Sequence, residues 1–145
     1  MTFKADLTKW VQKAKGKQDA VVRKIVIDLG KSIIIKNPVG DANYWKSPPP
    51  EGYVGGRSRA NWMYGNNVMP SGAIDNIDPS GSKTIAKLVA QVSSTPTASV
   101  HWIANSLPYV RRLESGYSRQ SPHGMVAITV LEFEQTVRKA AGSIK

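Results

Sequence analysis

The chain has 145 residues, of which 41% are hydrophobic and 21% are charged. This length and balance predict one folded domain with its own core, and they argue against wholesale disorder. The absence of cysteine excludes disulfides, thiolate metal sites and cysteine nucleophiles. No apolar run approaches the roughly 20 residues of a membrane span, and no secretory signal is recognisable. We therefore expect a protein that is assembled in the cytoplasm and has no membrane partner.

The formal net charge of +10 predicts attraction to polyanions such as nucleic acid. Much of the positive excess lies in residues 1–36. Four lysines there recur on one predicted helical face, namely Lys13, Lys17, Lys24 and Lys31. Two interpretations stay open, a stripe that binds a polyanion and the solvated side of an amphipathic helix. The second is favoured, because exposed lysines are the usual polar side of such a helix.

Helical spacing dominates the N-terminal region, residues 1–36. Its first apolar stripe consists of Phe3, Leu7, Trp10, Val11 and Ala14, and the spacing resumes at Val22 and continues to Ile33. Gly16-Lys17 is the candidate bend in this helical region. Asn37-Pro38 should end it, because proline lacks the N–H that a helix needs.

Residues 37–60 are rich in proline and glycine and predict a long loop or arm. Aromatic residues favour burial at a contact, so the aromatics of this arm argue for order, either within the chain or on assembly. They are Tyr44, Trp45 and Tyr53.

Strands and short helices are expected over residues 61–124. Trp62 and Tyr64 alternate with polar or flexible neighbours, which is typical of a short strand. Ser82 is placed to cap a helix with one apolar stripe. Residues 99–104 alternate again and predict a second strand, on which His101 is expected to be half-buried with its hydrogen bonds satisfied.

A C-terminal helix is expected over residues 125–142. Its apolar stripe is Val126, Val130, Phe133 and Val137, and Gly142 should stop it. The β-branched residues at its start leave open a strand that enters the helix. The chain as a whole then predicts an α+β fold. In it, a long N-terminal helix and a C-terminal helix pack on a small, mainly antiparallel sheet, with a long Pro/Gly-rich loop.

The segment Gly55–Trp62 sets two arginines beside an aromatic residue, after two glycines. It lacks the Gly-Lys-Ser/Thr element of a phosphate-binding loop, so it is a weak nucleotide cradle. A surface on which RNA bases stack stays open. The structural alternative is a hinge that leads into a strand with Trp62 in the core. Arg57 and Arg59 would then pair with carboxylates of the same or a neighbouring subunit.

The segment Asn105–Gly124 mixes aromatic, arginine and turn residues, a composition suited to a protein contact. Pro108 to Gly116 predicts a single helical turn in which Glu114 pairs with Arg111 or Arg112. His123 follows in a loop and lacks the nucleophile and orienting acid of a hydrolase. No pair of carboxylates suits acid–base catalysis, and no histidine has metal-ligand spacing, so we expect neither enzyme activity nor a metal or cofactor.

These two segments resemble the tail-completion or neck family of tailed bacteriophages, similar to the lambda minor tail protein Z. The family pattern Gly-Arg-x-Arg-x-x-Trp falls on Gly56, Arg57, Arg59 and Trp62, after Pro38-Val39. The pattern Asn-x-x-Pro-Tyr-Ala-x-x-Leu-Glu-x-Gly-x-Ser-x-Gln-Ala-Pro-x-Gly falls on Asn105, Pro108, Tyr109, Leu113, Glu114, Gly116, Ser118, Gln120, Pro122 and Gly124. Val110 and Ser121 stand where the family pattern has alanine.

The resemblance implies a non-enzymatic virion protein of the neck or tail that works in a ring of identical subunits, such as a hexamer or dodecamer. Its partners would be the head connector or adaptor and the tail tube or terminator, with genomic DNA passing through the lumen. We expect the subunit or partner interface at Arg57, Arg59, Trp62, Tyr109, Arg111, Arg112, Glu114, Tyr117, Gln120 and His123. The alternative is a basic nucleic-acid-binding module that uses the lysine face.

Overall fold

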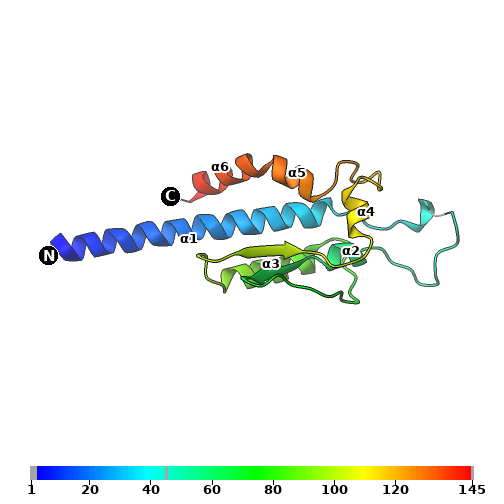
Figure 1. The fold of residues 1–145 in the computed structure, drawn as a ribbon, viewed down its shortest axis with the longest axis horizontal. Helices are drawn as coiled ribbons and strands as arrows, with labels where there is room; N and C mark the ends of the chain where they lie inside the picture. Colours follow the sequence, from blue (N-terminus) through cyan, green and yellow to red (C-terminus); the bar gives the residue numbers. More distant parts are fainter. Residues whose placement is uncertain (1–2, 45, 145) are drawn as a thin grey trace.

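The computed structural model describes residues 3–44 and 46–144, and the predicted α+β class is confirmed. A long helix opens the chain, and short elements form its middle. The elements are α1 (Phe3–Lys36), the 3-10 turn η1 (Ala42–Tyr44), α2 (Arg57–Ala60), β1 (Met63–Asn66), α3 (Ser82–Ser93), β2 (His101–Ala104), α4 (Val110–Glu114), α5 (Val126–Leu131) and α6 (Phe133–Ser143). Figure 1 shows α1 as the longest element, with α5 and α6 along one side and the sheet and α3 along the other.

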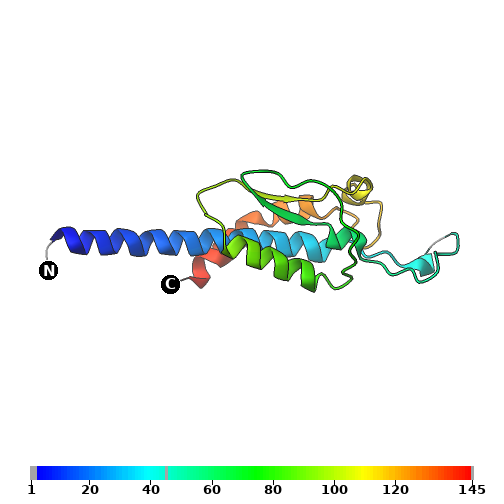
Figure 2. The ribbon, with the colours of Figure 1, turned by 90° about the horizontal axis from the view of Figure 1, so that it is seen from below.

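Helix α1 is continuous for 34 residues, about 51 Å at 1.5 Å per residue. The bend considered at Gly16-Lys17 is absent, since the helix continues through both residues. One glycine lowers helix propensity by only about 1 kcal/mol, which good helix formers on either side can offset. The predicted end is confirmed, because α1 stops at Lys36, directly before Asn37-Pro38. Its N-terminal part projects beyond the other helices (Figures 1 and 2).

The core lies where α1 meets α3 and the sheet. Val26 and Ile34 of α1 pack with Tyr64 of β1 and with Leu88 and Val92 of α3. The two helices approach closely at Gly30 of α1, where an added Cβ would lie 2.3 Å from Leu88 Cδ2. A glycine at this position therefore lets the core close.

The sheet has two antiparallel strands, β1 and β2, with Met63 opposite Ala104 and Asn66 opposite His101. The predicted half-buried histidine is confirmed. The Tyr64 hydroxyl lies 2.7 Å from His101 Nδ1, and His101 Nε2 lies 3.1 Å from the carbonyl oxygen of Thr97. Because a carbonyl can only accept, Nε2 carries the proton and Nδ1 accepts from the tyrosine hydroxyl.

The C-terminal helix is divided into α5 and α6 at Glu132, whose backbone has φ −85° and ψ −1°. Both helices pack against α1, on the side away from α3 (Figure 1). Gly142 was expected to stop the helix, but α6 includes it and ends at Ser143. Nothing lies within 4 Å of an added Cβ at Gly142, so this glycine is neither a left-handed cap nor a packing contact.

Candidate interaction surfaces

The first motif segment anchors the C-terminal end of α1. A helix end leaves its last carbonyl groups without intrahelical partners. The Arg59 guanidinium donates from Nη2 to two carbonyl groups at this end, Ile35 O at 2.8 Å and Asn37 O at 2.7 Å. Its Nη1 donates to Pro79 O at 2.6 Å, in the loop before α3. Burial lowers the pKa of Arg59, and the charge of Asp78 opposes that shift. Most of the Arg59 donors therefore bind backbone carbonyl groups within the chain. The expected ion pair of Arg59 with a carboxylate stays a prediction.

Asn37 is the hub of the same cluster, and its side chain is completely buried. Its Oδ1 accepts from Trp62 Nε1 at 2.9 Å and from Ser58 Oγ at 3.1 Å. Trp62 was predicted both as a core residue and as an interface residue, and these contacts support the first. Sequence reasoning used Asn37 only as part of a helix stop. Its position at the end of a helix, directly before proline, was the available signal for a larger role.

Glu114 does not pair with an arginine, contrary to expectation. Its Oε2 accepts the backbone N–H groups of Met125 and Val126, and its Oε1 accepts that of Ala127, each at 2.9 Å. These are unsatisfied donors at the start of α5, and a carboxylate at a helix N-terminus also meets the favourable end of the helix dipole. Burial raises the pKa of Glu114, but the three N–H donors outweigh burial and hold the pKa below its ordinary value.

Gln120 and Asn105 also serve the fold. The Gln120 side chain forms two hydrogen bonds with the backbone of Val39, accepting from N at 3.1 Å and donating to O at 2.8 Å. Asn105 Nδ2 donates to Ser58 O at 2.9 Å. The Asn105 bond holds the chain directly after β2 to α2, and the Gln120 bonds hold the loop before α5 to residue 39. Much of the second motif is therefore an internal scaffold. Gln120 is nevertheless exposed, and its role as an interface residue stays a prediction.

The motif residues that remain at the surface gather near α4. Arg112 lies over the ring of Tyr117, with its guanidinium carbon 5.3 Å from the ring centroid, and Tyr117 is 74% exposed. Arg57 is close enough to Tyr109 for its charge to act on that side chain. Burial nevertheless raises the pKa of Tyr109. Arg111 and His123 are also exposed. Arginine and tyrosine are enriched at protein interfaces, so this part of the predicted surface stays a prediction.

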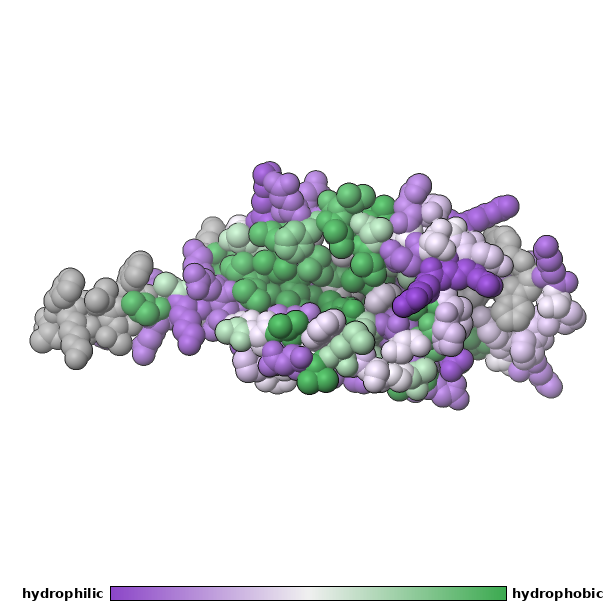
Figure 3. Space-filling model, in the orientation of Figure 1, coloured by the Kyte–Doolittle hydropathy of each residue, from purple (hydrophilic) through white to green (hydrophobic). Residues whose placement is uncertain are grey.

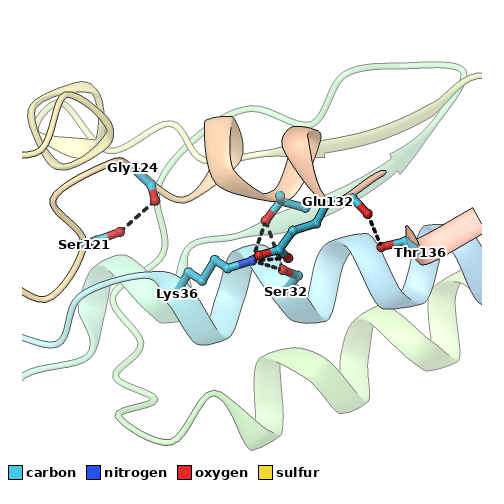
Figure 4. A network of polar contacts seen from close by, with 7 residues as sticks. Ser32, Lys36, Ser121, Gly124, Glu132 and Thr136 are labelled. Carbon is cyan, nitrogen blue, oxygen red and sulfur yellow. Dashed lines mark hydrogen bonds and ion pairs between the residues drawn. The ribbon is translucent and has the colours of Figure 1, made fainter. Parts of the chain in front are cut away.

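A polar seam joins α5 and α6 to α1 (Figure 4). The hydroxyls of Ser32 and Thr129 lie 3.0 Å apart, and Thr129 is buried. Lys36 Nζ donates to Ser32 Oγ at 2.6 Å and to Glu132 Oε2 at 2.7 Å. An ammonium that donates in this way has no lone pair with which to take a proton from the serine. The seam therefore fixes which face of α5 meets α1 and offers no activated nucleophile.

The opposite side of α5 and α6 is apolar and exposed. Val130 is 63% exposed, Leu131 80% and Phe133 48%, and Val126 is exposed beside them. Val126, Val130 and Phe133 belong to the apolar stripe that predicts the C-terminal helix, and all three are exposed. The fourth residue of that stripe, Val137, is half-buried. Figure 3 shows a broad hydrophobic area over the middle of α1 and the neighbouring α5 and α6. We call Val126, Val130, Leu131 and Phe133 the outer face.

The predicted lysine face lies along α1. Lys13, Lys17 and Lys31 are exposed, whereas Lys24 Nζ lies 3.2 Å from Asp28 Oδ2 in a pair one helical turn apart. Part of the predicted polyanion face is therefore neutralised within the helix.

Over residues 3–44 and 46–144, no group of three or more histidine, aspartate or glutamate residues is placed to hold a metal ion. Within the same ranges, no helix has the length and apolar character needed to cross a membrane. Searches with protein-family models, among curated proteins and among solved structures find no match to this chain.

Proposed function

We propose that this chain is a structural protein of a tailed-phage virion that completes the tail or joins it to the head, acting as a ring of identical subunits. The observation that carries the proposal is the outer face of α5 and α6. Three of its large apolar side chains are about half exposed or more in the single chain. Contiguous exposed apolar patches of this kind mark surfaces where proteins meet.

Helix α5 cannot rotate to bury the outer face against its own chain. The seam hydrogen bonds between Ser32 and Thr129 and between Lys36 and Glu132 fix the opposite side of α5 against α1. Covering one exposed Leu or Phe side chain is worth about 1.5–3 kcal/mol, so a partner that covers the whole face would gain several kcal/mol. That gain supports assembly as the role of the face.

The assignment to phage rests on the motif resemblance. The motif residues hold the chain's own segments together through Arg59, Glu114 and Gln120. The resemblance therefore supports a shared scaffold, on which the surfaces that meet partners can differ. The partners proposed are further copies of this chain, the head connector or adaptor, and the tail tube or terminator, with DNA in the lumen.

Light scattering coupled to size-exclusion chromatography tests the assembly directly. The wild type should elute as a closed oligomer, and Val130→Asp should elute as a folded monomer, because an aspartate cannot be buried there without a partner. Val68→Asp is the matched control, since Val68 is 75% exposed and lies outside the outer face. A wild type that stayed monomeric at high concentration, or a Val130→Asp variant that assembled normally, would count against the proposal.

The second candidate is a nucleic-acid-binding module. Exposed Lys13 and Lys17 on the projecting part of α1 favour it. Such a module would bind a short DNA duplex with a steep dependence on salt, and Lys13→Gln with Lys17→Gln would reduce that slope. Fluorescence anisotropy across a salt series separates the candidates. Micromolar binding by a monomer at physiological salt favours the module, and its absence favours assembly.

A further inference from the structure

Three exposed arginines around α4 have no acidic partner. Arg111 and Arg112 lie on α4, and Arg119 lies in the loop that follows. Within the part of the chain that the structure describes, none of the three forms an ion pair with a carboxylate. The neighbouring Glu114 carboxylate binds three backbone N–H groups, and these groups, not an arginine charge, lower its pKa. The positive charge of the three arginines is therefore not offset within the chain.

Tyr117 adds an open aromatic ring to the same surface. Its side chain is 74% exposed, and the Arg112 guanidinium lies over the ring, 5.3 Å from the centroid. A tyrosine this exposed buries little apolar area within its own chain. We call Arg111, Arg112, Tyr117 and Arg119 the arginine face.

The loop that carries Tyr117 and Arg119 is held in place by other residues. Gly116 has φ +91°, and a Cβ added there would collide with Pro122 O. The Gln120 side chain forms two hydrogen bonds with the backbone just after α1. The side chains of the arginine face take no part in these contacts. A surface that is fixed before it binds loses less conformational entropy when a partner arrives.

A second copy of this chain is a poor partner for the arginine face, because few of its carboxylates are free. Most of the carboxylates whose side chains the structure describes already accept a hydrogen bond or form an ion pair, namely Asp19, Asp28, Asp78, Glu114, Glu132 and Glu134. The others, Asp41, Glu51 and Asp75, lie in loops, and Asp75 is 4.0 Å from Arg57. With a net charge of +10, the chain offers no acidic face of its own. The partner must therefore bring dense negative charge.

We propose that the arginine face binds single-stranded nucleic acid. A guanidinium donates paired hydrogen bonds to a phosphate, and the three arginines supply such donors for successive phosphates. The open side of the Tyr117 ring stacks on an unpaired base, which a duplex does not offer because its bases stack on one another. Single strands of DNA and of RNA share this chemistry. The proposal does not depend on the assembly role, since the arginine face and the outer face lie on different elements.

Fluorescence anisotropy across a salt series tests the arginines, with labelled oligo-dT and oligo-rU of about 16 nucleotides as probes. The logarithm of the affinity should fall with the logarithm of the salt concentration with a slope of about −2, since each phosphate contact on a single strand contributes about −0.7. Arg111→Gln with Arg119→Gln should reduce the slope to about −0.7. Lys13→Gln with Lys17→Gln is the matched control. It also removes two exposed cations, but from the projecting part of α1, at the opposite end of the molecule from α4 (Figures 1 and 2).

Tyr117→Ala tests the stacking with the same probes. Loss of one stacked base should weaken binding about 5- to 100-fold at every salt concentration and leave the slope unchanged. Tyr117→Phe keeps the ring and should bind as the wild type does. With a duplex of the same length as the probe, Tyr117→Ala should bind as the wild type does, because no unpaired base is present.

Four results would overturn the proposal. The first is a lysine control that loses as much of the slope as the arginine variant, and the second is a Tyr117→Ala variant that binds the single strands unchanged. The third is displacement of the probe by poly-glutamate as effectively as by unlabelled oligo-dT, which would assign the arginine face to an acidic protein surface. The fourth is a wild type that binds neither probe. If that wild type still formed closed oligomers in light scattering, the assembly role would stand without the proposal.

Discussion

Removal of the Glu114 carboxylate should destabilise the fold far more than removal of an ordinary surface charge. Loss of a helix cap costs about 0.5–2 kcal/mol. The N–H groups of Val126 and Ala127 can regain water, because both residues are exposed. Met125 is completely buried, and an unpaired N–H there adds about 1 kcal/mol. Glu114→Ala should therefore cost about 1.5–3 kcal/mol, which lowers Tm by about 4–10 °C in a chain of this size.

Thermal unfolding followed by circular dichroism at neutral pH measures this cost. Glu134→Ala is the matched control, because Glu134 forms an exposed pair with Arg138 one turn away, and such a pair is worth less than about 0.5 kcal/mol. Arg112→Gln should leave Tm unchanged, since its guanidinium does not hold the Glu114 carboxylate. The assignment of Glu114 as a cap would be refuted if Glu114→Ala had the same Tm as Glu134→Ala. It would also be refuted if Arg112→Gln lowered Tm as much as Glu114→Ala does.

The pH dependence of stability gives an independent readout of the same carboxylate. Its pKa is lower in the folded chain than its ordinary value. The stability that Glu114 contributes is therefore complete above the unfolded pKa and is lost as pH falls through the folded pKa. Glu114→Gln takes up no proton at this position, so its stability should fall less steeply than that of the wild type when pH is lowered from 5 toward 3. Equal slopes would contradict the assignment.

Two further substitutions test the scaffold around the motif, both by chemical denaturation. Gly124 has φ +86°, and an added Cβ would lie 2.6 Å from Glu114 Oε1, whereas Gly72 has φ +91° and open space around it. Gly124→Ala should therefore cost at least about 2 kcal/mol and Gly72→Ala about 1 kcal/mol, and equal costs would contradict the close contact. Arg59→Lys should cost about 1–3 kcal/mol because an ammonium cannot reach all the carbonyls, while exposed Arg57→Lys should cost less than about 0.5 kcal/mol. A harmless Arg59→Lys would contradict the anchoring of α1.

The sequence was sufficient for those features that depend on local chemistry. Asn37-Pro38 ends α1 because proline cannot donate the next helical hydrogen bond. The alternation at residues 99–104 predicts β2, and the single turn before Gly116 appears as α4. The α+β class follows from the order of these elements.

Features that depend on which surface meets another could not be predicted in the same way. The spacing of Val126, Val130 and Phe133 shows that they share a helical side, but spacing does not say whether that side meets the core or a partner. The side of α5 that packs on α1 instead carries the small, polar Thr129. Its hydrogen-bond partner is Ser32, which lies 97 residues away in the sequence. Glu114 had arginines beside it in sequence, but three backbone N–H groups from the start of α5 bind its carboxylate.

Negative-stain electron microscopy of the purified protein tests the central claim most directly, that copies of this chain assemble through the outer face. The account predicts closed rings of uniform diameter for the wild type and single particles for Val130→Asp. The Val68→Asp control should give the same rings as the wild type. Single wild-type particles at every concentration, or unchanged rings in Val130→Asp, would contradict the account.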